Sequence, residues 1–126
     1  MIRTLSGVAA GVVSWMILVT LINLAIRFAW PDYKAAEPLL DFGLAMMIAR
    51  LLESGVSSLV AGFIAGWVER GQKAGWISGL ILLLLFLKDH IDLWKRFPVW
   101  YHLVFLISLP LLGWAGSKLK DKVFPS

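Results

Sequence analysis

Four long apolar stretches, separated by short polar segments, dominate the pattern of residues along the chain. They cover about residues 4–28, 45–69, 71–92 and 98–117. Each stretch has the roughly 20 residues that an α-helix needs to cross the hydrocarbon core of a bilayer. None alternates like a barrel strand, and lipid offers no partner to an exposed backbone, so the stretches are predicted to be helices. The pattern predicts an all-α, integral membrane four-helix bundle in one domain, residues 1–126.

The composition places most of the protein surface in lipid. Hydrophobic residues make up 60% of the 126 residues and charged residues only 16%, whereas soluble domains have roughly 45–50% and 25%. A soluble chain this short has no interior large enough for so much apolar surface, which excludes a soluble enzyme and a free nucleic-acid-binding domain. The chain has no cysteine, which excludes disulfides, zinc–thiolate sites and thiol catalysis.

Basic residues near the ends of the stretches predict the orientation in the membrane. With four spans, both termini and the 69–73 turn lie on one side, which carries six Lys and Arg residues against five on the other. We therefore expect both termini in the cytoplasm. Membrane lipids are the expected partners, and a homo-oligomer or a larger membrane complex is an open alternative. No nucleic acid is expected, because no basic run exceeds two residues.

Small residues recur every four positions in the second and third stretches. Gly62 and Gly66 precede the short turn, and Gly75 and Gly79 follow it. If the chain folds back at the turn, Gly66 lies level with Gly75 and Gly62 with Gly79. The two glycine faces then form a tight antiparallel hairpin, a glycine zipper, with axes closer than the usual ~8–10 Å. A dimerisation face is the alternative, and leucine at Gly62 or Gly79 is expected to destabilise the fold more than Gly113→Leu.

Polar residues gather where the second stretch begins, the third ends and the fourth begins. The predicted polar cluster consists of Arg50, Glu53, Lys88, Asp89, Asp92, Tyr101 and His102. We expect Arg50 to pair with one of the carboxylates Glu53, Asp89 or Asp92, because an unpaired guanidinium there has to be hydrated or bound to lipid phosphate. Pairing within the protein indicates a structural clasp, whereas a guanidinium that faces a cavity indicates a lipid or anion site.

Residues 38–49 are apolar on almost every side. Their pattern does not distinguish one long tilted helix from an outer helix that bends into the second span near Gly43. Glu37, directly before Pro38, is an expected helix start, since proline is favoured in a first turn.

No residue pattern of a reaction or a cofactor site is found. His90 and His102 are the only histidines, and they lack the spacing of a metal site. There is no Ser-His-Asp pattern, no phosphate-binding loop and no pair of carboxylates typical of acid–base catalysis. No catalytic, cofactor-binding or metal-ligating residue is therefore predicted. Asn23, deep in the first stretch, is expected to make a hydrogen bond between helices.

Three segments carry a resemblance to a known group of proteins. They are Met-Ile-Ala-Arg-Leu at 47–51, Ala-Gly-Phe-Ile-Ala-Gly at 61–66 and Phe-Pro-Val-Trp-Tyr-His-Leu-Val-Phe-Leu at 97–106. Over about residues 45–117 the chain resembles a group of uncharacterised small four-span bacterial inner-membrane proteins. The resemblance implies the location and the number of spans, and it implies no activity. The motif positions that it singles out are Arg50, Trp100, Tyr101 and His102.

Two functions are compatible with these patterns. The first is a non-enzymatic scaffold or accessory subunit, favoured by the small-residue seams and by the absence of a reaction pattern. The second is a small transporter or channel, in which polar residues form a vestibule on the outer side. Those residues are Arg50, Glu53, Asp89 and His102. A cavity that reaches from these residues past Gly79 favours transport, and a dry interior favours the scaffold. A membrane enzyme acting on lipid is the third and least supported function.

Overall fold

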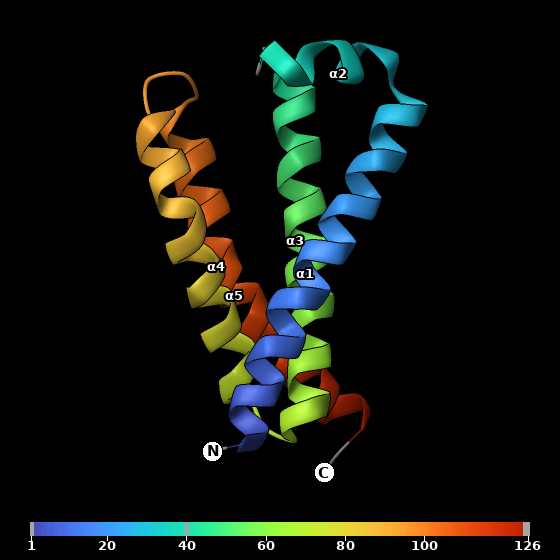
Figure 1. The fold of residues 1–126 in the computed structure, drawn as a ribbon, viewed down its shortest axis with the longest axis vertical. Helices are drawn as coiled ribbons and strands as arrows, with labels where there is room; N and C mark the ends of the chain where they lie inside the picture. Colours follow the sequence, from blue (N-terminus) through green and yellow to red (C-terminus); the bar gives the residue numbers. More distant parts are fainter. Residues whose placement is uncertain (1, 40, 125–126) are drawn as a thin grey trace.

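The computed structural model describes residues 2–39 and 41–124. The four long helices are α1 (Ile2–Ala29), α3 (Leu44–Glu69), α4 (Lys73–Asp92) and α5 (Val99–Val123). A short helix, α2 (Pro31–Ala36), and a 3₁₀ turn, η1 (Glu37–Leu39), connect α1 to α3. All four long helices are long and apolar enough to cross a membrane. The prediction of an all-α, four-helix membrane protein is confirmed (Figure 1).

The connection before α3 corrects one expectation. Glu37 lies in η1 and does not begin the spanning helix, which begins at Leu44 after the extended backbone of Gly43. Of the two forms considered for residues 38–49, the described residues show the interrupted one. At the other end of α3, Arg70 adopts a left-handed conformation with a φ of 64°. Its N–H donates to the carbonyl oxygen of Gly66 at 2.8 Å, which ends the helix and starts the turn into α4.

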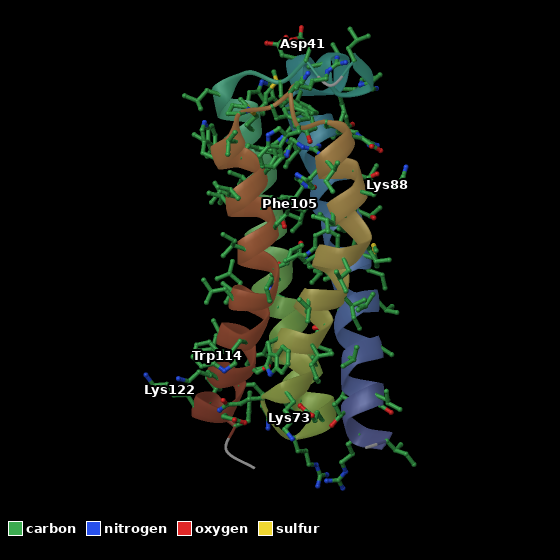
Figure 2. The ribbon with its side chains drawn as sticks, turned by 90° about the vertical axis from the view of Figure 1, so that its left-hand side faces the viewer. Asp41, Lys73, Lys88, Phe105, Trp114 and Lys122 are labelled. Atoms are coloured by element: carbon green, nitrogen blue, oxygen red, sulfur yellow. The ribbon has the colours of Figure 1, made fainter. Side chains whose placement is uncertain are left out.

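The four long helices form two arms that meet at one end and separate toward the other (Figure 1). One arm is α1 with α3, which also diverge from each other toward the open end, and the second is α4 with α5 (Figure 1). Both termini lie where the arms meet, and α2 lies at the opposite end between α1 and α3 (Figure 1). We call these the closed end and the open end. Figure 2 marks the closed end by Lys73 and Lys122 and the open end by Asp41.

The glycine faces of α3 and α4 pack on α5. A Cβ atom added to Gly62 would first meet the backbone of Gly113, and one added to Gly79 would first meet the backbone of Leu109. The nearest neighbours of Gly62 and Gly79 are therefore on α5 and are not each other, although α3 and α4 are consecutive and joined by a short turn. Gly113 occupies the position between the two faces, and a Cβ added there would meet the carbonyl oxygen of Gly75. This contact removes the basis for expecting Gly113→Leu to be the milder substitution.

The second predicted pair, Gly66 with Gly75, also packs on α5. Cβ atoms added to Gly66 and Gly75 would both meet Ser117 of α5. The Ser117 hydroxyl donates to the carbonyl oxygens of Gly62, at 3.1 Å, and Gly113, at 3.2 Å. Counting residues outward from the turn predicts the depth of each glycine in the bundle, but it does not predict which helix packs on that glycine. Here α5 has its own small residues, so it approaches both glycine faces more closely than the faces approach each other.

α1 packs on α3 and α4 near the closed end. A Cβ added to Gly7 would lie 2.8 Å from the Ala65 carbonyl oxygen, and one added to Gly11 would lie 2.8 Å from the hydroxyl of Ser78. Further along α1, the buried indole of Trp15 donates to the hydroxyl of Ser58 at 3.1 Å. These contacts leave little space between the helices in this half of the bundle. The space between the arms lies beyond Trp15, toward the open end.

Candidate functional site

A cavity of about 600 Å³ lies between the arms at the open end. All four long helices, η1 and the α4–α5 connection contribute to its lining. Trp15, Phe86 and Phe105 line the part that is deepest in the bundle, and Arg27 and Glu37 line the part nearest the open end. Figure 2 shows Phe105 between the closed end and the open end. The cavity therefore has a charged mouth and an aromatic interior.

Arg50 of α3 makes different contacts from those predicted. Its Nε donates to the Tyr101 hydroxyl at 3.0 Å, and its Nη1 donates to the Tyr33 hydroxyl at 2.9 Å. Its carboxylate partner is Glu37, whose Oε2 lies 3.9 Å from Nη1, and the guanidinium lies 4.7 Å from the centre of the Phe42 ring. The predicted pairing with Glu53, Asp89 or Asp92 is wrong, because α2 and η1 bring Tyr33 and Glu37 over the guanidinium. Arg50 is thus held within the protein, as the clasp interpretation expects, but by other residues.

Glu37 and Tyr33 are themselves bound to α1. Glu37 accepts hydrogen bonds from Asn23 Nδ2 at 2.8 Å and from Arg27 Nε. The Tyr33 hydroxyl, which is fully buried, donates to Asn23 Oδ1 at 2.8 Å. Asn23 therefore bonds to the α2–η1 connection, whereas the sequence suggested a bond to another spanning helix. Through Arg50, this network ties the connection to α1, α3 and α5 at once.

The protonation of two groups in the connection follows from these contacts. Burial raises the pKa of Glu37, but hydrogen bonds from Arg27 and Asn23 and the nearby guanidinium charges outweigh burial and hold the pKa below its ordinary value. Burial likewise raises the pKa of Tyr33, and the opposing effect of Arg50 is smaller. Glu37 is therefore an anion and Tyr33 a neutral hydroxyl near neutral pH. This matches their roles as acceptor and donor toward Asn23.

Glu53 lines the same cavity but has no such partners. In the described residues, its carboxylate takes part in no hydrogen bond and no ion pair, and its Oε2 is buried without a partner. The residue is 7% exposed. The neighbouring Ser54 hydroxyl, also in the lining, is buried without a partner as well. Most buried polar groups in proteins are hydrogen-bonded, so two adjacent exceptions in one cavity indicate a place for polar atoms of a ligand or of water.

The two histidines form a buried pair behind the cavity wall. Their Nδ1 atoms lie 2.7 Å apart, so one ring donates and the other accepts. His90 lines the cavity, whereas His102 is fully buried. The His102 ring stacks on the ring of Trp94, and its Nε2 atom is buried without a hydrogen-bond partner among the described residues. No group of three or more potential metal ligands occurs among the described residues. His102 therefore supports His90 and does not itself face the cavity.

The remaining members of the predicted cluster divide between the cavity and the surface. Asp89 and Asp92 line the cavity, as do Arg50, Glu53 and Tyr101. Lys88 pairs with Asp92 at 3.3 Å, and its side chain is 85% exposed and directed away from the bundle (Figure 2). Lys88 therefore lies on the surface and not in the site.

Several groups that line the cavity or its mouth are not among the residues predicted from the sequence. These are Arg27, Tyr33 and Glu37, together with His90 in the wall. One signal was available: Asn23 and Arg27 are four residues apart and share one face of α1. Nothing in the pattern of Tyr33 and Glu37 indicates that the connection folds over that face. In comparisons with protein-family models, with curated proteins and with solved structures, nothing matches the chain, so the function is inferred from the site's own geometry.

Proposed function

We propose that this multipass membrane protein binds a small amphiphilic molecule in the cavity at the open end and catalyses no reaction. The observation that carries the proposal is the cavity, whose volume of about 600 Å³ lies within the ~300–1,000 Å³ of small-molecule sites. Its charged mouth and aromatic interior match the polar and apolar parts of an amphiphile. Its lining contains no nucleophile beside a base, which supports a binding role over an enzymatic one.

The lining also supports an entry route from the lipid. Met16, Thr20 and Leu24 of α1 line the cavity, and all three are exposed on the surface of the bundle. An amphiphile in the same leaflet can reach the cavity along this side of α1 without crossing the membrane. If the termini are cytoplasmic in a bacterial inner membrane, as the basic residues predict, this is the outer leaflet.

The extent of the cavity supports a binding protein or a carrier over a channel. The lining reaches Trp15, Ser54 and Phe105 but does not include Gly79. The glycine seam beyond these residues packs backbone against backbone. A carrier open to one side, or the ligand-binding subunit of a larger complex, is consistent with such a cavity.

A scaffold or accessory subunit is the second candidate function. The closed end favours it, because Gly75 and Gly113 bring helix backbones into direct contact and make a rigid unit without reactive groups. This role needs no ligand, so the two candidates differ in whether the cavity is hydrated and occupied.

Cysteine accessibility tests the proposal directly, because the natural chain has no cysteine. Thr20→Cys places a thiol in the cavity lining, and Leu21→Cys places one at nearly the same depth on a residue outside the lining. In lipid nanodiscs, we expect a charged maleimide to label Thr20→Cys at least about tenfold faster than Leu21→Cys, since only a hydrated thiol ionises readily. Equal, slow labelling of both variants would favour the scaffold and contradict a hydrated binding cavity.

A further inference from the structure

Glu53 carries a buried carboxyl group that lines the cavity. The carboxyl group has no hydrogen-bond or ion-pair partner among the described residues, and only 7% of the surface of the residue is exposed. Both arginines of the lining are already engaged: Arg27 with Glu37, and Arg50 with two tyrosine hydroxyls. An anionic ligand would therefore have to displace existing contacts, whereas a cationic ligand would find an unpaired carboxylate.

The charge balance of the lining favours a cation as well. The lining contains two arginines and four carboxylates, Glu37, Glu53, Asp89 and Asp92, and Asp92 is also paired with Lys88 outside the lining. Asp89 and Asp92 lie on α4 across the cavity from α3, so carboxylates flank the space from both arms. The lining as a whole is negative with all six groups ionised, and a concave acidic surface attracts cations.

Aromatic rings complete the surroundings of Glu53. Trp15 and Phe86 lie 5.2 Å apart between ring centres, and Phe86 and Phe105 lie 5.8 Å apart, with all three rings in the lining. Tyr101 also lines the cavity and lies 6.5 Å from Phe105. The faces of such rings attract organic cations, and their apolar surface excludes small, strongly hydrated metal ions.

We propose that the ligand is a hydrophobic organic cation, an aryl-substituted or alkyl-substituted ammonium or phosphonium, with its charge at Glu53 and its apolar groups against Trp15, Phe86 and Phe105. The proposal rests on the proposed binding function and specifies its ligand class. The unpaired Ser54 hydroxyl, next to Glu53, is available to a polar hydrogen of a protonated amine.

Two probe ions of the same shape and opposite charge test this proposal. Tetraphenylphosphonium and tetraphenylborate are titrated into the purified full-length protein by calorimetry, with the parent chain and two variants. The first variant, Glu53→Gln, removes the buried charge and keeps the shape. The control, Asp41→Asn, removes an exposed carboxylate outside the lining.

We expect saturable binding of tetraphenylphosphonium that weakens about tenfold or more in Glu53→Gln and stays unchanged in Asp41→Asn. Protection of the Thr20→Cys thiol by the same ion locates it in the cavity. Unchanged binding in a folded Glu53→Gln variant, or stronger protection by tetraphenylborate, overturns the cation proposal and leaves the binding function intact. If neither ion binds saturably or protects the thiol, both proposals fail.

If the Glu53→Gln variant does not fold, Glu53→Asp replaces it in the titration. This variant is expected to bind the phosphonium ion more weakly than the parent chain but still measurably, because its carboxylate is displaced by one methylene.

Discussion

Arg50 and Glu53 lie three residues apart on α3 and have opposite surroundings. Arg50 is bound by Tyr33, Tyr101 and Glu37, so its guanidinium is satisfied within the protein. The Glu53 carboxylate has no hydrogen-bond or ion-pair partner in the part of the chain that the structure describes. Arg50 therefore links α3 to the α2–η1 connection and to α5, whereas Glu53 lines the cavity without such contacts.

The depressed pKa of Glu37 predicts how stability depends on pH. A carboxyl whose pKa is lower in the folded state adds stability above its unfolded pKa, near ~4.3. That contribution is lost as the pH falls through the lower, folded pKa. The melting temperature in detergent is therefore expected to fall between pH ~5 and ~3 as the contacts to Arg27 and Asn23 are lost.

Two variants isolate this effect in melting curves recorded over the same pH range. Glu37→Gln should reduce the pH dependence and lower the melting temperature at neutral pH. Asp41→Asn, which removes an exposed carboxyl at the same end of the molecule, should leave both unchanged. A parent chain and a Glu37→Gln variant with the same pH profile would show that Glu37 is not paired in solution.

Among the elements, α5 has the central place in the closed half of the bundle. Gly62 and Gly66 of α3 and Gly75 and Gly79 of α4 all face it. Because lipid provides no hydrophobic drive between helices, such close backbone contacts have a large share in holding the helices together. A side chain added at this seam should therefore separate α5 from one of the arms.

Alanine substitutions on α3 measure the importance of the seam. Gly62→Ala places a methyl group against the backbone of Gly113 and is expected to cost about 1–3 kcal/mol of unfolding free energy. Gly55→Ala is the control on the same helix, since its Cβ would meet only Leu112, at 3.4 Å, an ordinary contact. That change is expected to be neutral or to stabilise by up to ~1 kcal/mol. Equal unfolding free energies for the two variants would mean that α5 does not pack on Gly62.

The elements show which parts of the fold the sequence could predict. Apolar stretches of spanning length predicted the four long helices, because lipid leaves the backbone no other way to satisfy its polar groups. The four-residue spacing of Gly62, Gly66, Gly75 and Gly79 predicted close packing but not its partner, since a small-residue face accepts any helix that reaches it. Tyr33 and Glu37 could not be placed for a related reason: a short polar connection has no periodicity that shows which helix it covers.

At the scale of the whole molecule, the two halves of the bundle are packed differently. The closed half is packed through Gly113 and Ser117, and the open half surrounds a cavity with charges at its mouth. The α2–η1 connection keeps α1 and α3 together at the open end through Asn23 and Arg50. The two arms are also linked there, because Arg50 bonds Tyr101 of α5 and the ring of Phe42 stacks on that of Phe97, and the cavity lies between these linked helices.

The separation of the arms along their length tests this central claim most directly. Contacts of Gly7 with Ala74 and of Gly11 with Ser78 set the register of α1 and α4. Two pairs of spin labels at exposed positions keep that register: Val13 with Leu80 toward the closed end, and Leu24 with Ile91 at the open end. Pulsed electron paramagnetic resonance in nanodiscs should give a clearly longer distance for the open-end pair, as the diverging helices require (Figure 1). Equal distances for the two pairs would describe a parallel, closed bundle and would contradict a cavity between the arms.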